Sequence, residues 1–485
     1  MELGPLQTLI HFAYVLAASL FVVGLHMMNS PVSARRGNLI SAAGMVLAVV
    51  VTGVQLVVLG SPVTGQTEGL AWPIIIVGTL IGGGLGWYSA RKVKMTAMPQ
   101  LVSIFNAVGG GAAGLIAIED YWTAVQTAHA DVWLSIFVVA GSILGAVAFS
   151  GSVIATGKLQ GFISGAPIMF PGHRILTGAL AVVAIGGTVA LVLGALGVID
   201  VAGLEMAILA VIVLAALAFG VTMVMPIGGA DMPVVISLLN SGTGLAAAFA
   251  GLVLLNPVLI IAGALVGASG AILTKLMADA MNRSVLNVML GGFGGGAAAA
   301  AAGAGGATGT VREVAVDDVA IQLAYAQKVI IVPGYGLAVA QAQHAVRELA
   351  ELLEGRGVEV SYAIHPVAGR MPGHMNVLLA EANVPYHQLR EMEEINPEFA
   401  RTDVALVIGA NDVTNPAARS NPQSPIYGMP ILDVDQARSI VVIKRSMAAG
   451  YAGIDNELFV DPKTGMYFAD ARQGLTDLVA AVKLL

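Results

Sequence analysis

Two short stretches near the C-terminus carry residue types that suit a phosphorylated ligand. The first contains Gly334, Tyr335, Gly336, Ala338 and Val339, and it follows a β-branched run and precedes an Ala/Gln/Glu-rich stretch. This is a G-x-G-x-x-V pattern, in which Gly334 permits a tight turn and Gly336 lets the backbone approach a pyrophosphate at a helix N-terminus. Valine replaces the third glycine, so a purely structural glycine turn is the alternative interpretation.

The second stretch is Lys444-Arg445-Ser446, at the end of another β-branched run. Two cations and a hydroxyl suit a phosphate monoester. An NAD site would place an acid after the second strand, but the sequence there reads Ile364-His365-Pro366, with Arg370 shortly after. Together these features favour NADP over NAD, whereas Lys444 or Arg445 taken alone could be a solvated charge at a strand end.

Three further loops rich in small and polar residues follow predicted strands. They include Val367, Ala368, Gly369 and Arg370; Gly409, Ala410, Asn411 and Asp412; and Gly450, Tyr451, Ala452 and Gly453. Ligands bind at the carboxyl edge of open α/β sheets, so convergence of these loops would form a site. Asp412 could contact a cofactor or sense charge, but Gly-Ala-Asn-Asp is also ordinary turn chemistry.

The elements that must position these loops read as a parallel α/β sheet. Short β-branched runs at 329–332, 358–364, 404–408 and 440–443 alternate with helical stretches. This alternation predicts a doubly wound, Rossmann-like domain over residues 313–485. Residues 285–312 are rich in Gly and Ala, with an unbroken alanine run at 297–302, and are expected to form a linker.

Residues 1–284 have a different composition from the sheet domain. The whole chain is 57% hydrophobic and 11% charged, which indicates a membrane protein. A spanning helix needs about 20 apolar residues, because every backbone amide must bond within its own segment. The predicted fold is therefore a multi-pass α-helical bundle of about nine transmembrane helices followed by the Rossmann-like domain. The segments lie near 6–25, 38–59, 70–87, 101–118, 132–155, 175–198, 204–224, 233–255 and 258–276.

The loops between these segments alternate in charge. Basic residues occur after the first, third, fifth and ninth segments (Arg35, Arg36, Arg91, Lys92, Lys94, Lys158, Arg174, Lys275 and Arg283), and acids occupy most of the others. The positive-inside rule then places the N-terminus outside and the C-terminal domain in the cytoplasm. The chain has no cysteine, which excludes disulfides and thiolate chemistry, and no metal site or nucleic-acid partner is expected.

These motifs resemble proton-translocating NAD(P) transhydrogenases, specifically the beta subunit. The similarity in the C-terminal part lies in Pro333 to Gln343, His365 to Asn376, Gly409 to Asp412 and Lys444 to Gly453; in the membrane part it lies in Gly228 to Pro233, Leu239 to Ser241 and Met281 to Ser284. The resemblance implies hydride transfer between NAD(H) and NADP(H), coupled to proton movement.

The resemblance also implies roles for individual residues. Lys444, Arg445 and Ser446 match those that hold the 2′-phosphate, residues 334–339 those against the pyrophosphate, and residues 450–453 the loop that covers the nucleotide; His365 and its loop are carried over as cofactor-binding. Asp412 matches the residue tied to coupling between protonation and NADP(H) binding. The chain has one fingerprint, so NAD(H) is expected to bind to a partner alpha subunit. The resemblance implies a dimer of heteromeric units in the bacterial cytoplasmic (inner) membrane.

One position in the membrane part departs from the family pattern. Many members carry a histidine where this chain has Asn106, and a neutral amide does not titrate. The titrating group is therefore expected on partner helices, with Asn106, Asn240, Asp231 and Ser152 as candidates for the proton path. A structural helix–helix hydrogen bond is an equally open role for Asn106 and Asn240.

Two other functions fit parts of the pattern. A channel or secondary transporter could be regulated by a cytoplasmic NADP(H)-binding domain, and an NADP-dependent dehydrogenase could be anchored in the membrane. The first gives no reason for the long matched loops, and an anchor does not require nine helices. Hydride transfer between two nicotinamides depends on proximity and orientation. The absence of an evident set of catalytic acid/base residues from the C-terminal part of the sequence is therefore expected.

Overall fold

A computed structural model describes residues 4–485 with the exception of 29, 60–70, 94–96, 127–130, 165–166, 229–230, 283, 290–308, 370–372, 425, 449 and 451–453. The chain forms two compact units, one made of Met1–Ile227 and Val235–Thr274 and the other of Gly228–Val234 and Lys275–Leu485. The domain limits expected from the sequence, 284/285 and 312/313, stay a prediction. Most of the predicted linker lies outside the described residues.

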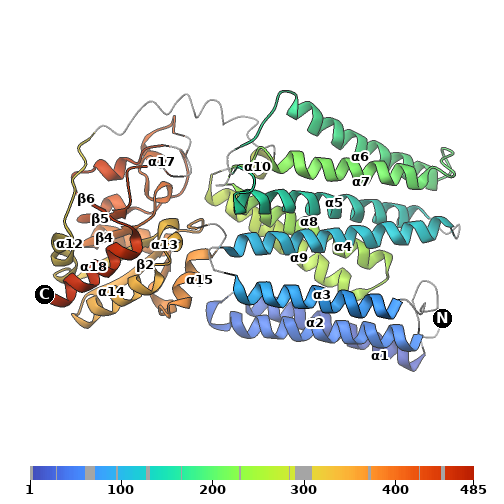
Figure 1. Cartoon of the computed structure of the whole chain (residues 1–485), viewed down its shortest axis with the longest axis horizontal. Coiled ribbons are helices and arrows are strands. Elements are labelled where there is room, and N and C mark those ends of the chain that lie inside the picture. Colours follow the sequence, from blue (N-terminus) through green and yellow to red (C-terminus); the bar gives the residue numbers. More distant parts are fainter. Residues whose placement is uncertain are drawn as a thin grey trace. The chain divides into compact units, whose positions relative to one another are not determined.

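The first unit is built from long apolar helices (Figure 1). Within the described ranges nine helices are long and apolar enough to span a membrane, which confirms the predicted bundle. They are α1 Pro5–Met27, α2 Pro31–Leu59, α3 Ala71–Lys92, α4 Met98–Gln126, α5 Val132–Gln160, α6 His173–Ala195, α7 Glu205–Val224, α8 Met232–Val253 and α9 Pro257–Ala280, and the short helix α10 Val285–Met289 follows.

Helix α5 shows how local sequence sets these elements. Its start is capped by Asp131, whose carboxylate accepts the Leu134 amide at 2.7 Å, and Gly161 ends it with a φ of 84°. A Cβ on Gly145 of α5 would come within 2.6 Å of the Gly110 carbonyl oxygen of α4, so only glycine permits this contact. The α4–α5 pair is therefore packed backbone against backbone.

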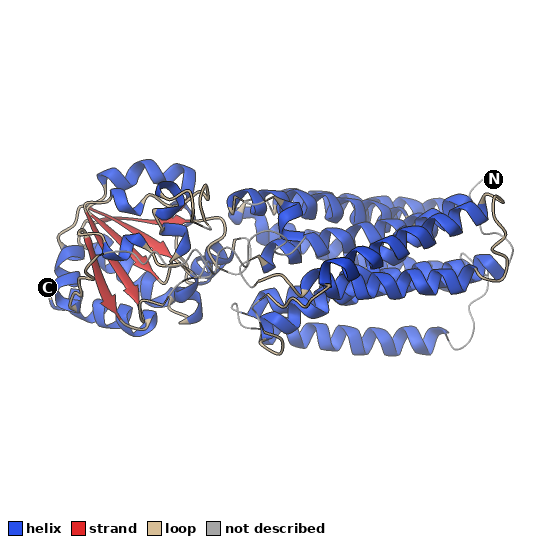
Figure 2. Ribbon diagram, turned by 90° about the horizontal axis from the view of Figure 1, so that it is seen from above, coloured by secondary structure: helices blue, strands red, loops and turns tan. Residues whose placement is uncertain are grey.

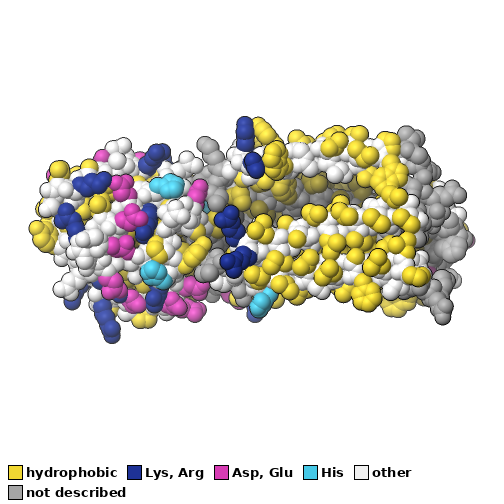
Figure 3. Space-filling view, turned by 90° about the horizontal axis from the view of Figure 1, so that it is seen from below, with side chains coloured by type: hydrophobic (Ala, Val, Ile, Leu, Met, Phe, Trp, Pro, Cys, Tyr) yellow, Lys and Arg dark blue, Asp and Glu magenta, His cyan; other side chains and the backbone are white. Residues whose placement is uncertain are grey.

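The outer surface of the bundle is apolar. Phe12, Val57 and Ile74 are exposed, and α3 contains no buried residue among those described. Figure 3 shows hydrophobic side chains covering this unit, with Lys and Arg gathered at one end, whereas charged side chains are spread over the sheet domain. Such a surface is favourable in contact with lipid or with other apolar helices, which agrees with a membrane location.

The second unit contains a six-stranded parallel sheet (Figure 2). The strands are β1 Lys328–Pro333, β2 Glu359–Ile364, β3 Leu389–Glu391, β4 Val404–Ile408, β5 Ser439–Lys444 and β6 Thr464–Phe468. Their order is β3-β2-β1-β4-β5-β6, so β1 pairs with both β2 and β4. The four predicted strands are confirmed, and β3 and β6 are additional edge strands.

Helices cover both faces of this sheet, as its two-sided apolar strands require. The longer helices are α12 Val316–Ala324, α14 Gln343–Gly355, α15 His374–Glu381 and α18 Ala471–Leu484; the shorter ones are α13 Tyr335–Val339, η2 Tyr386–Gln388, α16 Met392–Ile395, η3 Asn396–Arg401, η4 Asp412–Thr414, α17 Ala417–Ser420, η5 Val434–Gln436 and η6 Glu457–Val460. On one face, Ile330, Val407 and Val442 form a buried core with Phe399 and Phe459. Helices α12, α14 and α18 pack together.

The chain after β1 differs from a single continuous helix. Helix α13 has five residues, and α14 begins only at Gln343. Between them Gln341 has a φ of 50°, a left-handed conformation that helices of L-residues do not continue through. The sequence predicted one helical stretch here, and this break separates the glycine turn from the longer helix.

Candidate functional site

A cavity of about 440 Å³ opens at the carboxyl edge of the sheet, where the loops after several strands meet. The strand order explains this convergence. The chain builds outward from β1 in one direction to β3 and from β4 in the other direction to β6, so the loops after β1 and β4 diverge and leave a crevice between them. Its lining residues are Gly334, Tyr335, Gly336, Val339, Ala340, Val367, Ala368, Gly369, Gly409, Ala410, Asn411, Asp412, Val413, Ile443, Lys444, Arg445, Ser446, Ala448, Gly450, Ala469, Asp470 and Ala471. This volume lies within the range of small-molecule and cofactor sites.

Most site residues expected from the sequence line this one cavity. They come from all five expected loops: 334–336 with Val339, 367–369, 409–412, 444–446 and Gly450. Ala338 and His365 are buried and do not line it. Arg370, Tyr451, Ala452 and Gly453 lie outside the described residues.

The floor of the cavity is made by two glycine turns in contact. The Gly334 amide donates to the Ile408 carbonyl oxygen at 2.9 Å, and the Gly336 amide donates to that of Gly409 at 2.9 Å. A Cβ on Gly334 would lie 2.3 Å from the Ala410 backbone, and one on Gly336 would lie 2.6 Å from the Gly409 Cα. Both glycines are therefore required for packing between strand-end turns, and the Gly336 amide is already used within the protein.

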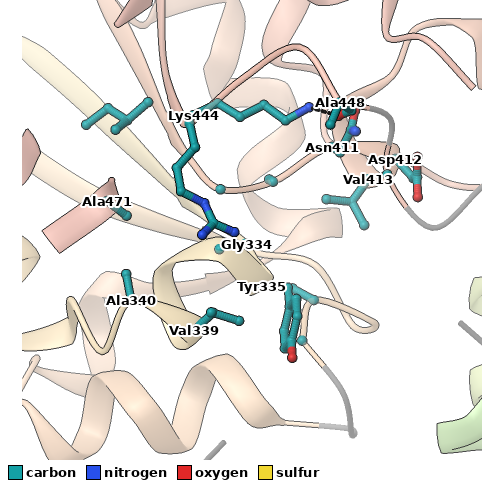
Figure 4. A pocket seen from close by; sticks show the side chains of 18 of the residues that line it. Gly334, Tyr335, Val339, Ala340, Asn411, Asp412, Val413, Lys444, Ala448 and Ala471 are labelled. Atoms are coloured by element: carbon teal, nitrogen blue, oxygen red, sulfur yellow. Dashed lines mark hydrogen bonds between the residues drawn. The ribbon is translucent and has the colours of Figure 1, made fainter. Parts of the chain in front are cut away.

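Lys444 and Arg445 supply positive charge to the cavity wall. Figure 4 shows the Lys444 side chain extending towards Asn411 and Ala448, with Tyr335 and Val339 on the α13 side. The Lys444 ammonium donates to the Ala448 carbonyl and lies 4.7 Å from the centre of the Phe459 ring. Burial lowers the pKa of Lys444, and the negative charges of Asp412 and Asp455 act in the opposite direction.

Asp412 and Asn411 lie opposite the glycine turn that follows β1, in the loop after β4 (Figure 4). Gly450 approaches them so closely that a Cβ there would be 2.6 Å from an Asp412 carboxylate oxygen and 2.8 Å from the Asn411 Nδ2. The loops after β4 and β5 are thus in direct contact inside the cavity wall. The Asp412 carboxylate consequently lines the same cavity as Lys444, Arg445 and Ser446 at the end of β5.

His365 supports the loop after β2 from beneath. Its side chain is 1% exposed, Nε2 lies 2.9 Å from the Pro430 carbonyl oxygen, and Nδ1 accepts the Val367 amide at 3.2 Å. Burial lowers the pKa of His365 to about 4, so the ring is neutral at pH 7. The imidazole positions Val367, which does line the cavity.

Several lining residues are not evident from the sequence motifs. Ala469, Asp470 and Ala471 follow β6, a strand without a β-branched run. The Asp470 carboxylate caps α18 by accepting the Arg472 amide at 3.1 Å. An Asp directly before a helical stretch is an N-cap signal that could have located this loop.

The candidate residues of the bundle fall into two groups. The Asn106 amide on α4 donates to the Ser152 hydroxyl on α5 at 2.9 Å, and Ser103 donates to the Ser152 carbonyl oxygen at 2.9 Å. Within the described part of the chain, the Asn106 carbonyl oxygen is buried without a hydrogen-bond donor. Asn240 is half-buried on α8, and Asp231 is half-buried in the turn before it.

Two further polar residues of the bundle were not among the predicted site residues, and one of them, Lys158, was predicted in a loop but lies buried in α5. Gln100 of α4 donates to the Leu159 carbonyl oxygen of α5 at 3.1 Å, continuing the polar contact between these helices. Lys158, 5% exposed near the end of α5, donates to the Met225 and Ile227 carbonyl oxygens at 2.5 and 2.8 Å. No cluster of metal-ligating side chains occurs in the described ranges.

Membrane-spanning helices followed by a parallel sheet with a cavity at its carboxyl edge place the chain among membrane proteins that carry a Rossmann-like domain. The sequence model of the NAD(P) transhydrogenase beta subunit family matches residues 10–481, and the chain belongs to that family. Two relatives from Rhodospirillum rubrum, one of them from a designated strain, are each named NAD(P) transhydrogenase subunit beta. Each is 51% identical over 477 residues, which cover 97% of this chain and 98% of the relative.

Proposed function

We propose that this chain is the membrane-embedded subunit of a proton-translocating NAD(P) transhydrogenase and binds NADP(H) at the carboxyl edge of its sheet. The observation that carries the proposal is the convergence of Lys444, Arg445 and Ser446 with the glycine turn after β1 in one cavity. Family membership supplies the reaction, because a transhydrogenase exchanges hydride between two nicotinamide nucleotides.

The chemistry of the cavity favours the 2′-phosphorylated nucleotide. Lys444 and Arg445 provide charge-assisted donors, and Ser446 adds a hydroxyl. The end of β2 presents Val367 and Ala368, not an acid that would bind a ribose diol. The lining therefore fits NADP(H). We place the 2′-phosphate beside Lys444 and Arg445, and the pyrophosphate beside the glycine turn after β1.

Bound NADP(H) supplies the hydride, and the residues of this chain bind and orient it. The described lining of the cavity contains no histidine, and its acids are Asp412 and Asp470. Hydride transfer does not require an acid/base residue in this lining, because the reaction depends on how two nicotinamides are held relative to each other. The second nucleotide, NAD(H), is assigned to a partner alpha subunit, in a complex that we take to be a dimer of heteromeric units.

Proton coupling is assigned to the bundle and to Asp412. The Asn106–Ser152 pair is neutral, so it can order water but cannot change charge at neutral pH, and the titrating group is placed on partner helices. Asn240 and Asp231 are further candidates for the path. Protonation would bias the sheet domain between states that release and states that retain NADP(H), and nucleotide occupancy must reciprocally shift the affinity for the proton.

The charge pattern of the loops supports a bacterial inner-membrane location with the sheet domain in the cytoplasm and the N-terminus outside. A channel or transporter regulated by NADP(H) is disfavoured by family membership. The two functions are distinguished by redox activity, since a channel would move ions without reducing a nucleotide.

The decisive experiment compares nucleotide binding by the full chain and a variant in detergent. Lys444→Ala with Arg445→Ala should weaken NADPH binding about 100-fold or more, because two charge-assisted contacts are lost. Binding of NADH should change less than about threefold. Calorimetric titration with each nucleotide measures both affinities.

A matched control removes one arginine and one lysine elsewhere in the sheet domain. Arg438 precedes β5 and pairs with Asp403 at 2.9 Å, and Lys463 precedes β6 and donates to the Asp435 carbonyl oxygen at 2.7 Å. Arg438→Ala with Lys463→Ala should leave NADPH affinity unchanged. An unmodified chain that binds NADH as tightly as NADPH would overturn the proposed cofactor.

A further inference from the structure

The loop after β4, which carries Asn411 and Asp412, is tied to the segment after the β5 loop by two buried asparagines. Asn456 is 2% exposed and Asn415 is 0% exposed. Neither side chain lines the cavity. Resting on the proposed function, we infer that Asn456 is a positioning residue that fixes Asn411 and Asp412 relative to the 2′-phosphate site.

Asn456 makes two kinds of contact with its two amide atoms. Its Nδ2 donates to the Asn411 backbone carbonyl oxygen at 2.9 Å and to the Asn411 side-chain oxygen at 3.2 Å. Its Oδ1 accepts the Leu458 amide at 2.9 Å and so caps η6. The accepting oxygen serves the local turn, whereas the donating nitrogen reaches a residue 45 positions away.

Asn415 makes the reciprocal connection. Its Nδ2 donates to the Asp455 carbonyl oxygen at 3.0 Å, and its Oδ1 accepts the Ala417 amide at 3.1 Å. Each segment therefore sends one buried side chain into the backbone of the other. Two crossed ties restrict sliding between the segments more than one tie would, because both must break before the loops separate.

Asn411 and Asp412 are also close to Gly450, which lies earlier in the loop after β5. Gly450 lies against the Asp412 carboxylate and the Asn411 amide, at a spacing that a Cβ would reduce to 2.6 and 2.8 Å. Asn411 thus lies between Gly450 and Asn456, and its neighbour Asp412 lies against Gly450. The negative charges of Asp412 and Asp455 act to raise the pKa of Lys444. The positions of these two carboxylates therefore affect the lysine that we propose binds the 2′-phosphate.

Capping of η6 requires only the Oδ1 of Asn456 and not its Nδ2, which donates to Asn411. Serine is also a favourable N-cap and could accept the Leu458 amide, but its side chain is too short to reach Asn411. Asn456→Ser therefore separates the cap from the tie. Asn396→Ser is the matched control, because Asn396 also bridges two segments, donating to the Ile431 carbonyl oxygen at 3.0 Å and accepting the Asp433 amide at 3.1 Å, and neither partner lines the cavity.

The test uses the complete transhydrogenase in membrane vesicles, with NADPH and an NAD analogue as substrates. Asn456→Ser should raise the KM for NADPH about tenfold, because a buried hydrogen bond that fixes the site is lost. The KM for the NAD analogue should stay within about twofold. Asn396→Ser should change neither KM, although both variants should lower the unfolding temperature to a similar extent.

Three results would overturn the inference: an unchanged KM for NADPH in Asn456→Ser, an equal rise in both KM values, or an equal rise in Asn396→Ser. Should Asn456→Ser fail to assemble, Asn456→Asp keeps the size and the cap but cannot donate to Asn411, and the same selective rise is expected. Failure of both variants to assemble would assign Asn456 to folding. If the unmodified complex does not prefer NADPH to NADH, the proposed function fails independently of Asn456.

Discussion

Lys158 of the bundle is buried and Lys444 of the sheet domain is half-buried, and their ammonium groups have different surroundings. Lys158 donates to two backbone carbonyls that follow the C-terminal end of α7. Lys444 donates to one, at Ala448, and lies in the wall of a cavity beside Arg445. The first lysine completes a helix end, where cations are favoured by the helix dipole.

The comparison extends to the other polar residues of each unit. In the bundle, Asn106 and Ser103 each donate a hydrogen bond to Ser152 on the closely packed neighbouring helix. In the sheet domain, polar groups from separate loops face a shared space. The described polar contacts of Lys158 are thus made with the backbone of the bundle, whereas Lys444 and Arg445 also face a cavity. Three predictions test this contrast, from the largest expected effect to the smallest.

Lys158→Met should destabilise the bundle by about 2 kcal/mol, since two buried carbonyl oxygens lose a charged donor. NADPH affinity should not change. All four tryptophans lie before residue 134, so their fluorescence during thermal unfolding in detergent reports on the bundle alone. Lys92→Met, which removes an exposed lysine from α3, is the control and should have little effect. A Lys158→Met variant that unfolds at the wild-type temperature but binds NADPH more weakly would contradict the stabilising role of Lys158.

Asn106→Ala and Ser152→Ala should each slow proton-coupled turnover about tenfold if the pair orders water in the path, which corresponds to the loss of one hydrogen bond. Because both act through the same 2.9 Å contact, the double variant should be no slower than either single one. Turnover and internal pH are followed together in vesicles. Thr188→Val, which removes an intrahelical bond in α6, should leave turnover intact. Unchanged turnover in the alanine variants would leave the pair a purely structural role.

Lys444→Arg should make NADPH binding less sensitive to alkaline pH. Burial lowers the pKa of Lys444, so the wild-type ammonium loses its proton, and the site loses affinity, as pH rises through that lowered value. Arginine stays charged, and the 2′-phosphate is already doubly ionised. As the pH rises above neutral, the wild-type chain should lose affinity at a lower pH than the variant. Parallel loss in both proteins would contradict a role for the lysine charge.

The sequence predicted those features whose physical signal is local. Long apolar segments specify the spanning helices, and the β-branched runs specify the four central strands. Strand β3, Leu389–Glu391, is short and charged, and β6 contains Gly465, so neither has a strand pattern of its own and both form by pairing with a neighbour. The loop with Asp470 was missed for the same reason.

The site was predictable to the extent that its residues follow recognisable strands. Lys444 and Asp412 could be placed at one edge because parallel strands end together, but their relation to Asn456 depends on contacts between distant loops. His365 shows what the sequence does not give. It was predicted to bind the cofactor from the family resemblance, and the structure buries its ring against Val367, behind the lining of the cavity. Burial and tertiary hydrogen bonds cannot be read from spacing alone.

The contact between Gly334, Gly336 and the backbone of Gly409 and Ala410 has a consequence for how the cavity changes size. A floor made of main chain has no rotamers to switch, and each displacement of one turn must carry the other with it. Any change in the size of the cavity must then come from its walls after β2 and β5, while the main-chain floor keeps its shape.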